Sequence, residues 1–179
     1  MHIGSTSIFE GKLTQKDLVK HIEDRLHLIP RYVQKVVPDP FNIGHPTWEA
    51  AEDFDIKNHI FKVEQDKTLN EKELAEIAGK TLTSVMDRNK PLWELYVVED
   101  FEGGNSAMIA KVHHCMVDGI SGVDLIKIMF DISPESVAPP KPEIVKEETV
   151  KKEPIQKLFE SVLGGLQETT SRLMEMQGG

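Results

Sequence analysis

The chain has 179 residues, a formal net charge of −9 and a hydrophobic fraction of 39%. This length favours one domain with an appendage, and the acidic balance argues against nucleic-acid binding, which needs basic side chains to neutralise phosphates. The single cysteine, Cys115, excludes an internal disulfide, and no apolar run approaches the ~20 residues of a membrane-spanning helix. The chain start lacks the features of a secretory signal peptide, so we expect a cytoplasmic protein.

The opening residues predict a strand followed by a capped helix. Residues 3–11 alternate weakly between apolar and polar side chains and end at a glycine, which favours a short strand. Thr14, with Asp17 three residues later, has the spacing of a capping box at a helix start. An apolar stripe at helical spacing then runs as far as Pro30, where we expect the helix to end. The stripe consists of Leu18, Ile22, Leu26 and Ile29.

Two further strands are expected in the next segment. Residues 32–40 read as a strand that two prolines stop. Residues 41–60 show no regular apolar pattern and are expected to form a loop. Residues 59–65 alternate in hydrophobicity as a strand does.

The clearest pattern is a helix that precedes a β-hairpin. Asn70 and Glu73 have capping-box spacing, and an apolar stripe follows them. The stripe consists of Leu74, Ile77, Ala78, Leu82, Val85 and Met86. Residues 93–101 and 106–114 then predict two strands, which the sequence Glu-Gly-Gly-Asn joins into a hairpin.

The chain changes character after residue 132. Ser121, with Asp124 three residues later, predicts a capped helix that runs through Phe130. Residues 133–154 are rich in Pro, Glu and Lys and predict a linker, because such a composition buries little apolar surface. Residues 155–179 carry a helical apolar stripe and predict an amphipathic helix. We therefore expect a domain over residues 1–132, a linker and an appended helix.

The alternation of strands and helices predicts an α/β (α+β) fold. We expect a mixed sheet with helices packed on one of its faces.

A histidine pair follows the last predicted strand and indicates a reactive site. Strand alternation would place His114 on the face of Met108, Ala110 and Val112, with His113 on the other face. An imidazole at the edge of a sheet has the pKa range of a general base for a hydroxyl or a thiol.

The residues that follow the histidine pair have possible roles in the same site, and simpler interpretations exist for all of them. Asp118 would orient the turn or hold a charged partner, and Gly119 would let a ligand approach the backbone closely. A packed histidine and an ordinary Asp-Gly turn would explain the same residues without any chemistry. A metal site is disfavoured, because adjacent histidines on a strand point to opposite faces and no helical His-x-x-x-His is present.

The segment HHCMVDG matches the HHxxxDG signature of the CoA-dependent acyltransferase superfamily, which includes chloramphenicol acetyltransferases and peptide-synthetase condensation domains. Residues 82–134, with the sequence Pro-Leu-Trp-Glu upstream of the histidines, closely resemble the bacterial wax ester synthase/diacylglycerol acyltransferase family. The segments MHIGSTSIFEG, IPRYVQKVV and DFDIKNHIFKV resemble the N-terminal half of that family in the same order. The resemblance implies a chloramphenicol-acetyltransferase-like half.

The resemblance also implies roles for the site residues. His114, at the position of the second motif histidine, would remove the proton of an alcohol or diacylglycerol hydroxyl, which then attacks an acyl-CoA thioester without a covalent enzyme intermediate. His113 would support it, Asp118 would be mainly structural, and Gly119 would keep the approach open. Trp93 would pack in the core or contact substrate, and core packing is favoured for a large aromatic residue. Arg31 and Arg88 are candidate partners of Asp118, although exposed arginines without such a role are common.

Members of the family are longer, with two similarly folded halves and the site in a channel between them. The resemblance therefore implies that this chain is an N-terminal half that needs a C-terminal half or a partner chain. Alone it would have little activity and would self-associate through an uncovered apolar face. Acyl-CoA would be a substrate, no cofactor or metal is expected, and contact with a membrane surface or lipid inclusions is consistent with such substrates.

Two alternatives stay open at this point. The chain would be a non-catalytic binding or structural remnant if it keeps the motif without the reaction. A condensation-domain relative that acts on carrier-bound acyl groups is disfavoured by the Pro-Leu-Trp-Glu context.

Overall fold

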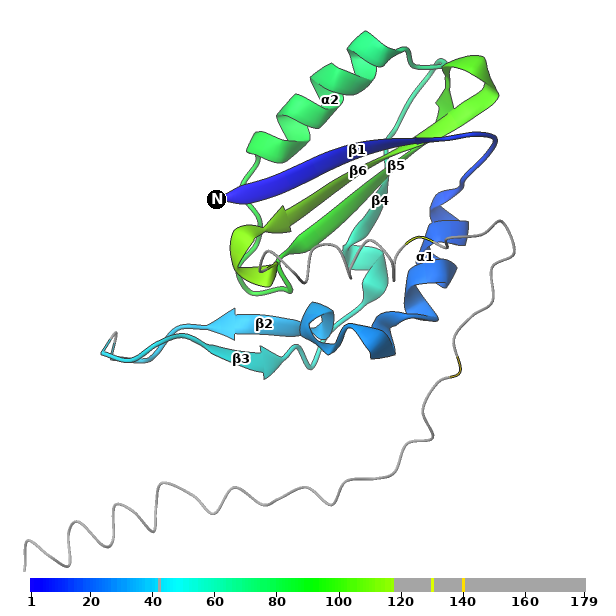
Figure 1. Cartoon of the computed structure of the whole chain (residues 1–179). Helices are drawn as coiled ribbons and strands as arrows, with labels where there is room; N and C mark the ends of the chain where they lie inside the picture. Colours follow the sequence, from blue (N-terminus) through cyan, green and yellow to red (C-terminus); the bar gives the residue numbers. More distant parts are fainter. Residues whose placement is uncertain (42, 118–129, 131–139, 141–179) are drawn as a thin grey trace, which may run out of the picture. The chain divides into compact units, whose positions relative to one another are not determined.

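The computed structural model describes residues 1–41, 43–117, 130 and 140, and every element below lies in that part. A four-stranded mixed sheet with the order β1-β6-β5-β4 forms its centre (Figure 1). β1 and β5 both pair antiparallel with β6, whereas β4 pairs parallel with β5. The four strands are β1 (His2–Phe9), β4 (Ile60–Lys62), β5 (Trp93–Phe101) and β6 (Asn105–His113). The predicted mixed sheet is confirmed.

Helix α1 (Gln15–Glu23) begins as predicted and ends early. The Thr14 side chain accepts a hydrogen bond from the N–H of Asp17, and the Asp17 carboxylate accepts one from the N–H of Thr14. The predicted end at Pro30 is wrong. The buried Arg25 donates through its side chain to the carbonyl oxygen of His21, while its own N–H bonds to Ile22 instead. The apolar stripe then continues on two 3₁₀ turns, η1 (Leu26–Leu28) and η2 (Pro30–Val33).

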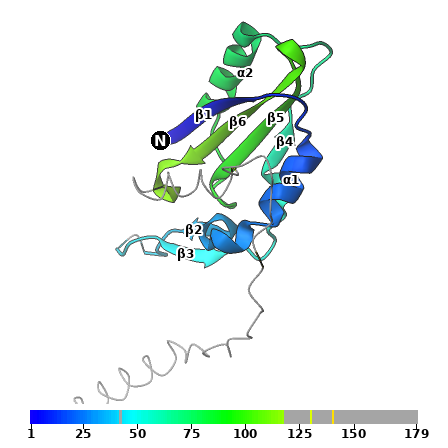
Figure 2. The ribbon, with the colours of Figure 1, turned by 45° about the vertical axis from the view of Figure 1, so that its right-hand side comes forward.

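The segment that we expected to be a loop contains a strand. β3 (Thr47–Ala50) pairs antiparallel with β2 (Gln34–Val37), and the two form a separate ribbon (Figure 2). Trp48 is the one half-buried residue of β3, so its sequence has no alternation that would reveal a strand. A short 3₁₀ turn, η3 (Ile56–Asn58), then leads into β4.

Helix α2 (Glu71–Thr83) also begins at its predicted capping box, formed by Asn70 and Glu73. It ends before the last two residues of the predicted stripe, because Ser84 has an extended backbone. Val85 is consequently 87% exposed, whereas Met86 is buried in the cluster that also contains Leu18 and Ile22 of α1.

The predicted hairpin of β5 and β6 is confirmed. The connection η4 (Glu102–Gly104) places Gly103 and Gly104 at φ values of +77° and +76°, a region that side chains disfavour.

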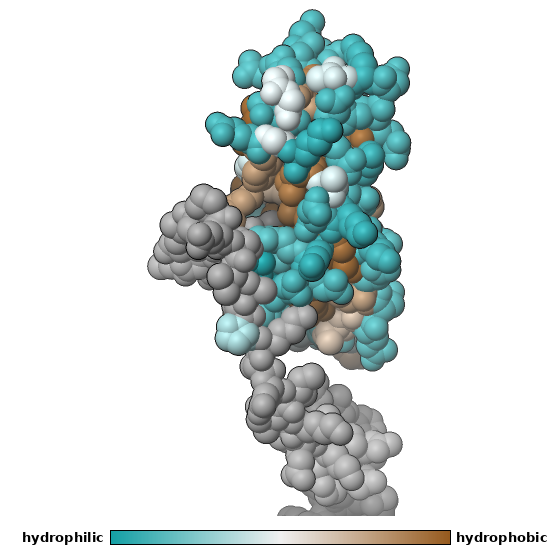
Figure 3. Space-filling view, turned by 90° about the vertical axis from the view of Figure 1, so that its right-hand side faces the viewer, coloured by the Kyte–Doolittle hydropathy of each residue, from teal (hydrophilic) through white to brown (hydrophobic). Residues whose placement is uncertain are grey.

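The helices cover opposite faces of the sheet, which corrects the expectation of a single covered face. On one face, Leu18 and Ile22 of α1 belong to the same cluster as Met108. On the other face, Leu74 and Ala78 of α2 pack with Ile109. Both faces need covering because β5 and β6 carry continuous apolar runs instead of alternating ones. On the face drawn in Figure 3, hydrophilic residues predominate and hydrophobic ones show in narrow patches between them.

Several predicted elements lie outside the described residues. These are the helix from Ser121, the linker at 133–154 and the amphipathic helix at 155–179. Within the part that the structure describes, no helix has the length and apolar character needed to cross a membrane.

Candidate functional site

The histidine pair lies where β6 ends and a 3₁₀ turn, η5 (His114–Met116), begins. His113 is the last strand residue and caps this turn, because its Nδ1 accepts a hydrogen bond from the N–H of Cys115 at 3.3 Å. The Sγ of Cys115 lies 3.0 Å from the same nitrogen. His113 is thus held in place through one ring nitrogen.

Basic groups lie on the other side of the His113 ring. The amino group of Met1 lies 3.4 Å from its Nε2, and the His2 ring meets it edge-on at 5.7 Å between centroids. Partial burial lowers the pKa of His113 first, and electrostatic interactions with the chain terminus, His2, Arg88 and His114 lower it further. The ring is therefore kept neutral near pH 7.

His114 has left the strand, so strand alternation does not determine where its side chain points. It is exposed, and its N–H donates to the carbonyl oxygen of Met1 at 3.0 Å. In the described part of the chain, its ring has no hydrogen-bond partner.

The other predicted site residues divide into two groups. Asp118 and Gly119 lie outside the described residues. Arg31 and Arg88 belong to the described residues. The Arg31 guanidinium stacks over the Trp48 ring, 4.3 Å from its centroid, and Arg88 lines the same cavity as His113.

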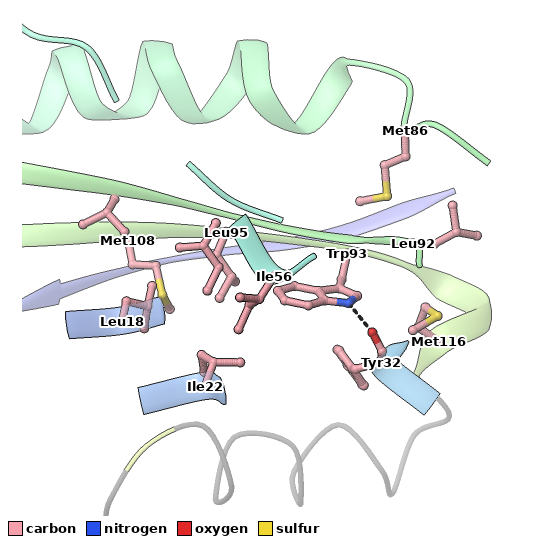
Figure 4. Packing of buried hydrophobic residues seen from close by; sticks show 12 residues of the cluster. Leu18, Ile22, Tyr32, Ile56, Met86, Leu92, Trp93, Leu95, Met108 and Met116 are labelled. Atoms are coloured by element: carbon pink, nitrogen blue, oxygen red, sulfur yellow. Dashed lines mark hydrogen bonds between the residues drawn. The ribbon is translucent and has the colours of Figure 1, made fainter. Parts of the chain in front are cut away.

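Trp93 is a core residue with only 2% of its surface exposed. Its indole nitrogen donates to the carbonyl oxygen of Tyr32 at 2.8 Å, and its ring stacks on His59 at 4.6 Å between centroids. Figure 4 shows Ile56, Leu92 and Tyr32 near its ring, with the hydrogen bond to Tyr32 drawn as a dashed line. This agrees with the favoured interpretation of Trp93 as core packing.

Two cavities flank the strand end that carries the histidines. One, which we call the apolar cavity, has a volume of about 260 Å³ and almost wholly apolar walls. The residues that line it include Ile22, Tyr32, Trp93, Met108, Val112 and Val117. The other, of about 540 Å³, is called the basic cavity; it includes Lys35, Val37, Arg88, Leu92, His113 and Cys115. Because Val112 and Val117 bracket the pair, the apolar cavity lies within a few residues of it.

Sequence reasoning missed a buried charge two residues before His113. Lys111 is fully buried, and its Nζ donates to the Ser84 hydroxyl at 2.6 Å and to the Glu94 carboxylate at 3.3 Å. The Tyr96 hydroxyl also donates to Glu94, at 2.9 Å. A lysine inside an apolar strand was the available signal, since a lysine is rarely buried without partners. The network joins β5, β6 and the end of α2 beside the histidines.

Metal ligation has no support in the described residues. Among them, no group of three or more His, Cys, Asp or Glu side chains lies close enough together to hold an ion.

Comparison with known proteins identifies the family. The sequence model of the "Wax ester synthase/diacylglycerol acyltransferase catalytic domain" matches residues 1–178. The chain belongs to the wax ester synthase/diacylglycerol acyltransferase family. A probable diacylglycerol O-acyltransferase of Mycobacterium tuberculosis is 32% identical over 132 residues, which are 73% of this chain and 28% of that protein.

Solved structures agree with the family and with the predicted fold. The wax ester synthase/diacylglycerol acyltransferase of Marinobacter aquaeolei superposes with a TM-score of 0.59 at 26% identity, covering 78% of this chain and 36% of that one. The starter condensation domain of a rhizomide synthetase superposes with a TM-score of 0.57 at 8% identity, covering 72% and 30%, and this likeness concerns the fold alone. The chain thus spans about a third or less of the length of these relatives.

Proposed function

We propose that this chain supplies the general base for the transfer of an acyl group from acyl-CoA to the hydroxyl of a long-chain alcohol or a diacylglycerol. The observation that carries the proposal is the position of the HHxxxDG histidines at the end of β6: His113 lines the basic cavity, and Val112 and Val117, on either side of the pair, line the apolar cavity. The family assignment supplies the class of reaction.

In the proposed reaction, His114 accepts the proton of the acceptor hydroxyl through a ring nitrogen. The oxygen then attacks the thioester carbonyl, the C–S bond breaks, and the imidazolium returns the proton to the CoA sulfur. The products are an ester and free CoA, so atoms and charge balance without a covalent enzyme intermediate.

The contacts of the two histidines favour His114 as the base. The Nδ1 of His113 already accepts the Cys115 N–H, and its Nε2 faces the Met1 amino group. The exposed ring of His114 has no such partner in the described part of the chain. His113 would therefore position the turn that carries His114.

Cys115 is a weaker candidate for the reacting group. Partial burial raises the pKa of its thiol, so the protonated form prevails at neutral pH. A thiol nucleophile needs the opposite shift.

A chimera tests the proposal in a full-length setting. Residues 1–132 of this chain would replace the matched segment of the M. tuberculosis relative, and ester formation from palmitoyl-CoA with hexadecanol or a diacylglycerol would be followed by thin-layer chromatography. We expect ester synthesis by the chimera. We expect little by residues 1–179 alone, because half of the substrate-positioning walls would be missing.

The remnant hypothesis gives the opposite result. A chimera that folds, as shown by circular dichroism and gel filtration, and makes no ester would support a non-catalytic role. Asp118→Asn separates structure from chemistry in the same background. We expect it to lower both activity and melting temperature, and a loss of activity alone would give Asp118 a direct chemical role.

A further inference from the structure

The basic cavity has the size of a small-molecule site, and the reaction described above assigns no ligand to it. Its volume of about 540 Å³ lies within the range of ligand pockets, roughly 300–1,000 Å³. Strand β2 and the residues after it form one wall, and the loop between α2 and β5 forms another. The turn that carries His113 and Cys115 completes it.

Its charge is opposite to that of the whole chain. Lys35 and Arg88 both line it, and none of its described lining residues is acidic. Glu49 is the residue opposite Lys35 in the β2–β3 pairing, yet the two make no ion pair. Within the described part of the chain, neither Lys35 nor Arg88 has a carboxylate partner, although the chain carries nine more acidic than basic side chains.

Two acidic residues near the cavity are already committed to their own loops. The Asp39 carboxylate accepts the N–H groups of Phe41, Ile43 and Gly44. The Asp87 carboxylate accepts the N–H of Asn89. In the described part of the chain, neither makes an ion pair with Lys35 or Arg88.

The titratable groups around His113 are also basic. Apart from burial, every group that lowers its pKa is a cation or another histidine, with the chain terminus, His2 and Arg88 among them. A bound anion would oppose these charges and raise the pKa of His113.

We propose that the basic cavity binds the phosphate groups of a phosphorylated small molecule, with Arg88 and Lys35 as the cationic ligands. The Arg88 guanidinium offers the planar fork that matches a phosphate, and Lys35 supplies a second point charge. The apolar walls at Val37 and Leu92 would hold the uncharged part of the ligand. Resting on the proposed function, the expected ligand is the CoA moiety of the acyl donor.

Phosphate chemistry has two sources, a CoA ester or a phospholipid headgroup. Residues 1–179 would be titrated by calorimetry with CoA, with dephospho-CoA, which lacks the 3′-phosphate, and with pantetheine, which has no phosphate. Vesicles of phosphatidylglycerol form the lipid arm, and inorganic phosphate tests the bare anion.

The variants Arg88→Ala and Lys35→Ala test the site. Lys72→Ala is the matched control, since Lys72 is an exposed lysine of α2 that does not line the cavity. We expect CoA to bind about tenfold or more weakly to Arg88→Ala, because a charge-assisted contact is lost. Arg88→Lys should keep part of the affinity, and added salt should weaken all phosphate binding.

An NMR titration supplies a readout that does not depend on activity. CoA should raise the pKa of His113 in the wild-type chain and in Lys72→Ala, and have no such effect in Arg88→Ala. Binding of vesicles instead of CoA, with the same dependence on Arg88, would keep the phosphate site and assign it to a headgroup.

The proposal is overturned if no phosphate ligand binds, or if binding is unchanged in folded Arg88→Ala and Lys35→Ala. Pantetheine binding as tightly as CoA would overturn it as well. The proposed function can fail independently of the site. If CoA binding depends on Arg88 but the chimera is inactive, the phosphate site is supported and the proposed function is contradicted. If the chimera is active and Arg88→Ala does not change its KM for acyl-CoA, the proposed function is supported and the proposed phosphate site is contradicted.

Discussion

The indole nitrogen of Trp93 donates a hydrogen bond to the carbonyl oxygen of Tyr32 at 2.8 Å. The bond ties the start of β5 to the 3₁₀ turn before β2, two parts of the chain that are far apart in sequence. Trp93 thereby links the central sheet to the segment that leads into β2.

Trp93→Phe should destabilise the fold by about 2–4 kcal/mol. The smaller ring leaves a cavity, and the buried carbonyl oxygen of Tyr32 loses its donor. Urea unfolding followed by circular dichroism measures the change. A loss below about 0.5 kcal/mol would show that the core repacks without the indole.

Tyr32→Phe should leave stability unchanged or raise it. The Tyr32 side chain is buried, and its hydroxyl has no hydrogen-bond partner among the residues that the structure describes. Removing an unpaired buried hydroxyl removes a desolvation penalty while keeping the ring. Thermal melting provides the comparison, and a fall of several degrees would mean that the hydroxyl has a partner in solution.

Stability should fall as the pH drops below about 6.5, the ordinary pKa of histidine, and His59 should contribute to that fall. Burial lowers the pKa of His59, whose ring lies stacked between Phe54 and Trp93. Because the folded-state pKa is below the unfolded one, the unfolded chain binds more protons in this window. The stabilisation is complete above the unfolded pKa and is lost toward the folded pKa.

The His59→Gln variant isolates this effect from other titrating groups. Its melting temperature should vary less than that of the wild type between pH 7 and pH 5. Parallel curves for the two proteins would show that His59 does not contribute.

Lys111→Met should cost roughly 2 kcal/mol or more of unfolding free energy. The change removes a buried ammonium and leaves the Glu94 carboxylate and the Ser84 hydroxyl without it. Lys62→Met is the matched control, because Lys62 is 43% exposed and pairs with Glu99 at the surface. Such a surface pair contributes about 0–1 kcal/mol. Equal losses in the two variants would contradict a structural role for the Lys111 network.

In the active chimera, His114→Ala should lower turnover by about a hundredfold or more, the usual effect of losing a general base. His113→Ala should lower it less, since that ring holds the turn without accepting the substrate proton. Steady-state assays with palmitoyl-CoA measure both. Equal losses with intact folding would contradict the assignment of the base to His114.

Local signals explain which parts of the fold could be predicted. Both capping boxes, at Thr14 and at Asn70, depend on contacts three residues apart and were confirmed. The strand β3 depends on pairing with β2, and the burial of Lys111 depends on Glu94 and Ser84. Neither feature could be predicted from the adjacent residues, because the partners are distant in sequence. The roles of the histidines stay predictions, because they depend on substrates and on the partner of Asp118.

The bare backbone at Gly4 has a consequence for the histidine pair. A Cβ at this position would lie 2.0 Å from the Cδ2 of Leu82, so the edge strand meets α2 without a side chain there. In the β1–β6 pairing, Gly4 is opposite Lys111 and His2 is opposite His113. A slip of one residue would press Ile3 or Ser5 against Leu82 and carry His2 away from His113. Gly4 therefore helps to set the register of β1 against β6, and this register places His2 opposite His113 of the HHxxxDG motif.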